Sequence, residues 1–242
     1  MNTSKLFRSL VALTLIPLVL TAPGVSFADD VATSESLTTL FRASRKVISV
    51  NQALINDEAK GDKGLDGKSV VAMAKANYKE AAGKPLSAGK AQKAMLDSVS
   101  EIMSEAQELI NQEGVGFKGF LPAIFARRVA GRFSQKMQGS MSIKLTAPKK
   151  YVRNRANRPD KWEYDVIENK FKSEGYENGK PFYEVSKSKG KDAFRYILPE
   201  YYGESCLGCH GTPKGELDIT GGKKEGGVLG ELGGAISLAI FK

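Results

Sequence analysis

Histidine and cysteine are nearly absent from this chain, which has one histidine and two cysteines among its 242 residues. A structural zinc site takes about four nitrogen or sulfur ligands, so these residues are too few to build one. A metal held by two histidines is excluded for the same reason. All three residues nonetheless fall together, as Cys206, Cys209 and His210, in the stretch YYGESCLGCHGTPKGE.

Long apolar runs are also scarce, and only residues 10–20 form one. That run is shorter than the roughly 20 apolar residues of a comfortable bilayer span. It follows the basic residues Lys5 and Arg8 and precedes small residues, which predicts a signal peptide over residues 1–28, cleaved after Ala28. A retained N-terminal anchor is the alternative. We therefore expect an exported, periplasmic protein with no stable membrane span after cleavage.

Acidic residues are fewer than basic ones, with 27 Asp and Glu against 36 Lys and Arg, for a formal net charge of +9. The excess is spread over short clusters, and no long basic run is interleaved with aromatic residues. Such a pattern is typical of a solvated surface, so we expect no nucleic-acid partner. Acidic protein partners remain compatible with it.

The pattern of apolar residues changes near residue 140. Before it, apolar side chains recur at three- and four-residue spacing and predict helices; after it, short β-prone runs alternate with Gly and Asn turns and predict an antiparallel sheet. One further helix is predicted over 160–172, because Asp160 and Glu163 form a capping-box pattern. Helices first and an antiparallel sheet later make the fold class α+β; the family resemblance given below implies, more closely, an antiparallel sheet with flanking helices and a long N-terminal helical extension. We assign residues 29–139 to the helical region and 140–242 to the β-rich region of one domain.

The spacing C-x-x-C-H is the attachment signature of c-type haem. Two thiols three positions apart on a tight turn reach the two vinyl groups at one porphyrin edge, and the next imidazole then becomes the proximal iron ligand. A thioredoxin-like thiol pair is an alternative, but it usually begins a helix within a βαβ unit, which is not predicted here. A plain disulfide would leave the histidine unexplained. The sequence thus predicts one haem c, with thioethers to Cys206 and Cys209 and iron bound by His210.

The sixth iron ligand stays open. Methionine is the usual choice in electron-carrying cytochromes c, but Met95 and Met103 lie on an apolar helix face, where core packing is the favoured interpretation. Met137 and Met141 are freer, and a lysine, a tyrosine or an open position are further alternatives. Because no distal histidine exists for acid–base chemistry, we expect no enzyme.

Three stretches carry a family resemblance: YVRNRANRPDKWE (151–163), YILPEYYGESCLGCHG (196–211) and LDITGGKKEGGVLGELGGAISL (217–238). Together they resemble the Tll0287-like family of haem c proteins, which implies a PAS-like fold and haem on the C-x-x-C-H residues. In some members a cysteine on the N-terminal helix is the distal ligand, and alignment by eye places Asn51 there. Asn51 is thus either a distal-pocket hydrogen-bond donor or a satisfied amide at the edge of the core. Arg153 is a candidate contact for a haem propionate, although turn and cap roles are favoured for its segment.

Two functions follow from these features. The first is an exported single-haem c-type cytochrome that acts as a redox or diatomic-gas sensor, with a small diatomic ligand or a partner protein as its counterpart. The alternative is a periplasmic electron-transfer cytochrome c with a redox partner protein. The long N-terminal helices could also form a homodimer, although amphipathic helices more often pack on their own domain.

Overall fold

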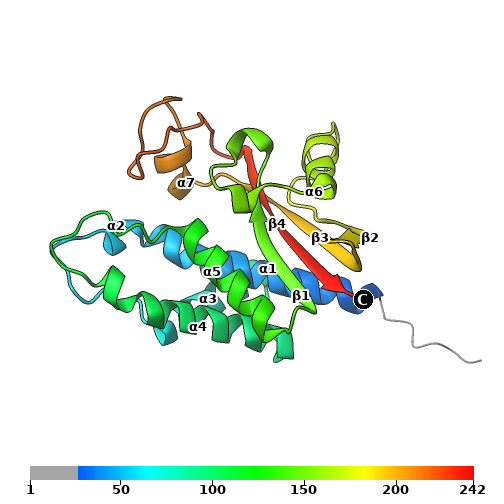
Figure 1. Ribbon diagram of the computed structural model, residues 1–242, viewed down its shortest axis with the longest axis horizontal. Coiled ribbons are helices and arrows are strands. Elements are labelled where there is room, and N and C mark those ends of the chain that lie inside the picture. The colour runs from blue at the N-terminus through cyan, green and yellow to red at the C-terminus, as the bar shows by residue number, and fades with distance from the viewer. Residues whose placement is uncertain (1–26) are drawn as a thin grey trace, which may run out of the picture.

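The computed structural model describes residues 27–242, so the predicted signal peptide over 1–28 lies almost wholly outside it. Five helices come first, and the strands follow (Figure 1). The helices are α1 (Phe27–Val50), α2 (Gln52–Ile55), α3 (Gly67–Ala82), α4 (Lys90–Ile110) and α5 (Pro122–Lys136). The later elements are β1 (Met141–Thr146), α6 (Lys161–Asp165), β2 (Phe182–Ser188), β3 (Lys191–Tyr201), α7 (Glu204–His210) and β4 (Leu232–Phe241).

The four strands form one sheet in the order β1-β4-β3-β2, and all their pairings are antiparallel. The C-terminal strand β4 lies in the middle, with Thr146 of β1 opposite Ala235 and Met141 opposite Ile240. This arrangement confirms the α+β class with an antiparallel sheet. The PAS-like description of the sheet stays a prediction.

Helices cover both faces of the sheet. On one face, Phe194, Tyr196 and Leu198 of β3 join a large hydrophobic core with α1, α3, α4 and α5. On the other, Ile197 packs with α6 and the turn that follows it. Successive strand residues point to opposite faces, so a β3 that is buried at every position from Ala193 to Pro199 is what a sheet covered on both faces requires.

The predicted helix over 160–172 is only partly α-helical. Its capping box is present: the Asp160 carboxylate accepts from the Glu163 amide, and the Glu163 carboxylate accepts from the Asp160 amide. The α-helix ends at Asp165, however, and a π-helical turn follows over Val166–Lys170. With this wider turn the consecutive residues Val166 and Ile167 are both buried against the sheet. The predicted helix is therefore present, with an α-helical part to Asp165 and a π-helical part to Lys170.

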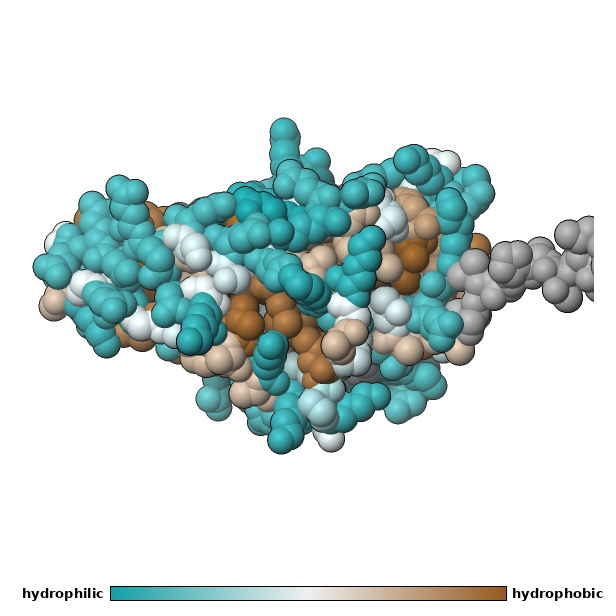
Figure 2. Space-filling view, turned by 90° about the horizontal axis from the view of Figure 1, so that it is seen from below, coloured by the Kyte–Doolittle hydropathy of each residue, from teal (hydrophilic) through white to brown (hydrophobic). Residues whose placement is uncertain are grey.

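The helical layer is mostly hydrophilic on its outer side. Seen from below, it presents polar side chains around a central strip of hydrophobic ones (Figure 2). Within residues 27–242, no helix is both long and apolar enough to cross a bilayer.

Candidate functional site

Cys206, Cys209 and His210 lie on α7, a short helix that begins after Gly203, directly beyond the end of β3. The sequence predicted a tight turn, and the structure replaces it with a helix of seven residues. Residues three and four positions apart share a helix face, so both thiols and the imidazole are presented on one side. Both cysteines are free and half-buried.

Helix α1 contacts both the end of β3 and the start of α7. Glu200, at the end of β3, pairs with Arg42 and Arg45 of α1, and the Arg42 guanidinium also donates to the Pro199 carbonyl at 2.9 Å. One turn further along α1, the hydroxyl groups of Ser49 and Ser205 lie 2.9 Å apart. The end of the sheet and the C-terminal end of α1 therefore hold the start of α7 in place.

The chain between α7 and β4, residues 211–231, is a glycine-rich loop that folds back onto α7. The amides of Gly227 and Gly226 donate to the carbonyls of His210 and Gly211 at 2.7 and 3.1 Å. The Tyr202 ring stacks on the His210 ring, with 5.3 Å between centroids and 17° between planes. A Cβ on Gly227 of this loop or on Gly233 at the start of β4 would lie within 2.5 Å of the Tyr202 ring, so glycine is needed at both positions to let this ring pack against the histidine.

One nitrogen of His210 has a protein partner. Its Nδ1 lies 2.9 Å from Oε2 of Glu225 in the glycine-rich loop. Its Nε2 makes no hydrogen bond within residues 27–242. The ring is therefore fixed on one edge and on one face, by Glu225 and by Tyr202, while Nε2 stays available to bind a metal.

Arg153 connects the loop to α7. Its Nε pairs with Glu225, its Nη1 pairs with the buried carboxylate of Asp218, and its Nη2 donates to the Cys209 carbonyl at 2.6 Å and to the Lys223 carbonyl at 3.0 Å. All three guanidinium nitrogens are thus engaged by the protein itself. Arg153 thus links Asp218 and Glu225 to the Cys209 carbonyl, an arrangement that we call the Arg153 clamp. A propionate contact for Arg153 stays a prediction.

Asp218 organises the tip of the same loop. Its Oδ1 accepts from the amide and the hydroxyl of Thr220 at 2.7 and 2.6 Å. Burial alone would raise the pKa of Asp218, but the hydrogen bonds from Thr220 and Arg153 outweigh it and lower the pKa to about 2. The ionised form of Asp218 is therefore more stable in the folded protein than in the unfolded chain.

This pKa makes stability depend on acid in a defined window. Because the folded pKa of Asp218 is about 2 and the ordinary value is 3.8, its contribution of about 2 kcal/mol is complete above pH 5 and is lost as the pH falls toward 2. We expect the free energy of unfolding of Asp218→Asn to lie about 2 kcal/mol below that of the wild type at pH 6, with the gap closing toward pH 2. Urea titrations at each pH measure it, and a gap that stays constant would contradict the assignment.

The thiols do not have the features of a redox pair. Burial, followed by the nearby charge of Asp218, raises the pKa of the Cys209 thiol above its ordinary value. Reactive thiol pairs instead have a lowered pKa. The described strands also pair only antiparallel, so α7 is not part of a βαβ unit. Both observations disfavour the thioredoxin-like alternative.

Asn51 makes no side-chain hydrogen bond to α7 within residues 27–242. It follows the last residue of α1, and its side-chain nitrogen donates to the Val47 carbonyl at 2.8 Å. Ser49, which does contact α7, is two residues away and so about 200° around the helix from Asn51. The structure thus gives Asn51 a local amide hydrogen bond, and a distal-pocket role stays a prediction.

The four candidate methionines lie in or against the hydrophobic core of the helical layer. Met95 and Met103 are fully buried in the helical core, in agreement with the favoured interpretation of their helix face. Met141 pairs with Ile240, about 26 Å along β4 from Leu232, the residue beside the end of β3. Met137 is also buried and precedes β1 at that far end.

The surroundings of α7 suit a large planar apolar group. Four large hydrophobic side chains on the glycine-rich loop are more than half exposed, namely Leu217, Ile219, Val228 and Leu229. The hydroxyl of Tyr202 is buried and has no hydrogen-bond partner, although buried polar groups nearly always find one. Exposed apolar surface and an unsatisfied polar atom beside two free thiols and an available imidazole nitrogen fit a haem better than a bare metal ion. No group of three or more His, Cys, Asp or Glu side chains within residues 27–242 is placed to hold such an ion.

The fold and the site together define an α+β protein that presents C-x-x-C-H on a short helix at the end of an antiparallel sheet. The family model described as Tll0287-like matches residues 75–240, and the chain belongs to the Tll0287-like family. No curated protein and no solved structure matches the chain. The matched range contains Arg153, α7 and the glycine-rich loop but not Asn51.

Sequence reasoning missed Asp218 and Glu225. Both lie in the glycine-rich stretch, which was assigned no role beyond the family resemblance. Their position among glycines is nevertheless a signal that could have found them, because a glycine-rich loop has few apolar side chains to bury and is held in place by polar contacts. The partner that would have revealed them, Arg153, is 65 and 72 positions away in the sequence.

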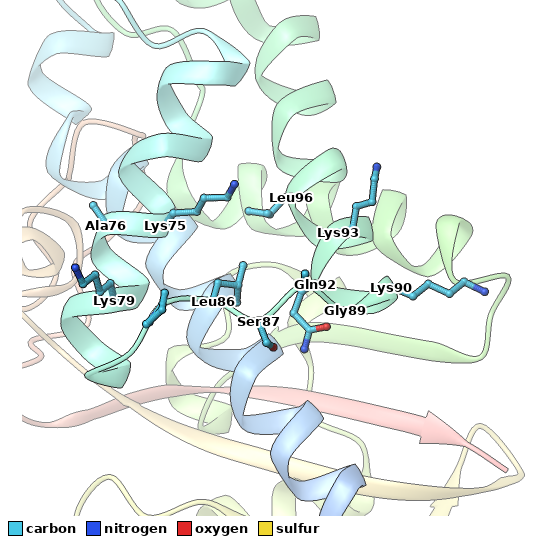
Figure 3. A pocket seen from close by; sticks show the side chains of 12 residues that line it. Lys75, Ala76, Lys79, Leu86, Ser87, Gly89, Lys90, Gln92, Lys93 and Leu96 are labelled. Carbon is cyan, nitrogen blue, oxygen red and sulfur yellow. The ribbon is translucent and has the colours of Figure 1, made fainter.

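A separate groove lies between α3 and α4, with a volume of about 730 Å³. Figure 3 shows its apolar floor with Leu86 and Leu96 and, around it, lysines from both helices. None of the residues of the C-x-x-C-H site lines it. The groove is therefore distinct from the site that the motif defines.

Proposed function

We propose that this protein is an exported c-type cytochrome with a single covalent haem, which acts as a sensor or ligand-binding protein for redox state or a diatomic gas. One observation carries the proposal: Cys206, Cys209 and His210 share one face of α7, and the Nε2 of His210 has no hydrogen-bond partner in the part of the chain that the structure describes. Membership of the Tll0287-like family supports it.

The chain's own residues have distinct tasks in this proposal. Cys206 and Cys209 form the two thioether links, and Nε2 of His210 binds the iron. Glu225 and Tyr202 orient the histidine ring, and the apolar side chains of the glycine-rich loop exclude water from its surroundings. The haem supplies an iron that changes oxidation state and binds small ligands.

The choice of a sensor over an electron carrier depends on the sixth coordination position. Met95 and Met103 are buried in the helical core, and Met141 lies at the far end of the sheet. A carrier of the usual kind needs a methionine at this position. An iron that is five-coordinate or weakly closed is therefore favoured, and such an iron suits a diatomic ligand.

Absorption spectra of the purified protein test the proposal. We expect a high-spin contribution in the ferric and ferrous states, and rapid binding of CO and NO to the ferrous protein. The same measurements on Met141→Leu are the control, and they should give unchanged spectra because Met141 is too distant to bind. A low-spin spectrum with a methionine–iron band that resists CO would overturn the sensor in favour of the electron-transfer alternative.

A further inference from the structure

His210 has a carboxylate partner on the edge of the ring opposite its metal-binding nitrogen. On the basis of the proposed function, we infer that Glu225 is a positioning residue that holds the proton on Nδ1 of His210 and makes Nε2 a stronger electron donor, which lowers the reduction potential of the bound iron. This assigns a role to a loop residue that no motif marks.

The contact is held firmly from both sides. Glu225 Oε2 lies 2.9 Å from Nδ1 of His210, and the Glu225 side chain is only 14% exposed. Arg153 fixes the same carboxylate through its Nε and, at 3.0 Å, its Nη2. On the face of the imidazole, the stacked Tyr202 ring resists rotation. The ring therefore cannot turn without breaking contacts on two sides.

The chemistry of this pair follows from the carboxylate's charge. An ionised carboxylate accepts hydrogen bonds and cannot donate them, so a neutral imidazole facing Glu225 carries its proton on Nδ1. The Arg153 guanidinium, paired with the same carboxylate through Nε and Nη2, supplies the positive charge that an ionised Glu225 needs at this partly buried place. A carboxylate on the outer nitrogen raises the basicity of a metal-bound histidine. A more basic ligand stabilises ferric iron relative to ferrous iron.

The alternative role for the pair is a structural ion pair that fastens the loop to α7. The loop is already fastened there without it, by the amides of Gly226 and Gly227 on the carbonyls of Gly211 and His210 and by Arg153 on the Cys209 carbonyl. Removing the charge of Glu225 should therefore change the iron more than it changes the fold.

The potential of the haem-loaded protein is the first test. In Glu225→Gln, which keeps the shape and removes the charge, we expect the equilibrium between ferric and ferrous iron to shift about tenfold toward ferrous, or about 59 mV. The iron–histidine stretching frequency in resonance Raman spectra should fall as well. The matched control is Glu216→Gln, which neutralises an exposed carboxylate of the same loop paired with Lys224. Equal potentials and equal frequencies in Glu225→Gln and the wild type would overturn the inference.

A second measurement does not depend on haem. His210 is the only histidine, so nitrogen-15 labelling of histidine gives the signals of this ring alone in the full chain without haem. At alkaline pH we expect the neutral ring to carry its proton on Nδ1. A mixture of both tautomers in the haem-free chain would overturn the inference, even if a separate preparation of the protein is shown to carry covalent haem. The expected tautomer in a protein that never acquires haem would support the role of Glu225 and reject the proposed function instead.

Discussion

Replacing both Cys206 and Cys209 by serine should remove covalent haem from the protein completely. A thioether needs a sulfur atom, and the described chain has no other cysteine. The His210 imidazole and its partners Glu225 and Tyr202 remain, so haem could still associate, but only reversibly. Haem staining after denaturing electrophoresis measures the difference, and the mass of the intact protein should fall to that of the polypeptide.

Ser205→Ala and the two single cysteine variants are the controls for the double cysteine variant. Ser205→Ala, which alters the exposed neighbour of Cys206 and its contact with Ser49, should keep full covalent staining. Each single cysteine variant should retain weaker staining through one remaining thioether. Unchanged staining in the double variant would refute haem c attachment.

The features that could be predicted from the sequence are those set by near neighbours. The capping box of Asp160 and Glu163 depends on residues three positions apart, and the structure confirms it. The shared face of Cys206, Cys209 and His210 likewise follows from spacing alone, whether the local structure is a turn or a helix. The antiparallel sheet was predictable because short β-prone runs alternate with Gly and Asn turns in the later part of the chain.

The rest of the site could not be predicted because it is assembled from distant segments. The clamp joins Arg153 to Asp218 and Glu225, and no local pattern links an arginine after β1 to carboxylates in a later loop. The glycines at 227 and 233 are explained only once the Tyr202 ring lies against them. Asn51 was predicted to be either a distal-pocket donor or a satisfied amide; the structure shows a local hydrogen bond to the Val47 carbonyl, and the distal-pocket role stays a prediction.

Replacing Arg153 by methionine should be among the most destabilising single changes in the chain. Methionine keeps an unbranched chain over the first part of the side chain, but the carboxylates of Asp218, with a fully buried side chain, and Glu225 lose their cationic partner. Removing one partner of a buried ion pair typically costs about 3–5 kcal/mol, because it leaves an uncompensated charge. Since the Arg153 side chain is 29% exposed, we expect about 3 kcal/mol from urea unfolding at pH 7.

Hydrogen exchange shows where Arg153→Met loosens the protein, which distinguishes the loss of the ion pairs from a general loss of packing. Hydrogen exchange at the Gly226 and Gly227 amides, which bond to the end of α7, should accelerate, because the loop loses its clamp. Arg155→Met is the matched control: Arg155 is exposed and forms no ion pair within residues 27–242, so its unfolding free energy should stay within about 0.5 kcal/mol of the wild type. Adding Asp218→Asn to Arg153→Met removes one stranded charge and should restore part of the stability. Equal losses in the two arginine variants would show that the clamp does not stabilise the site.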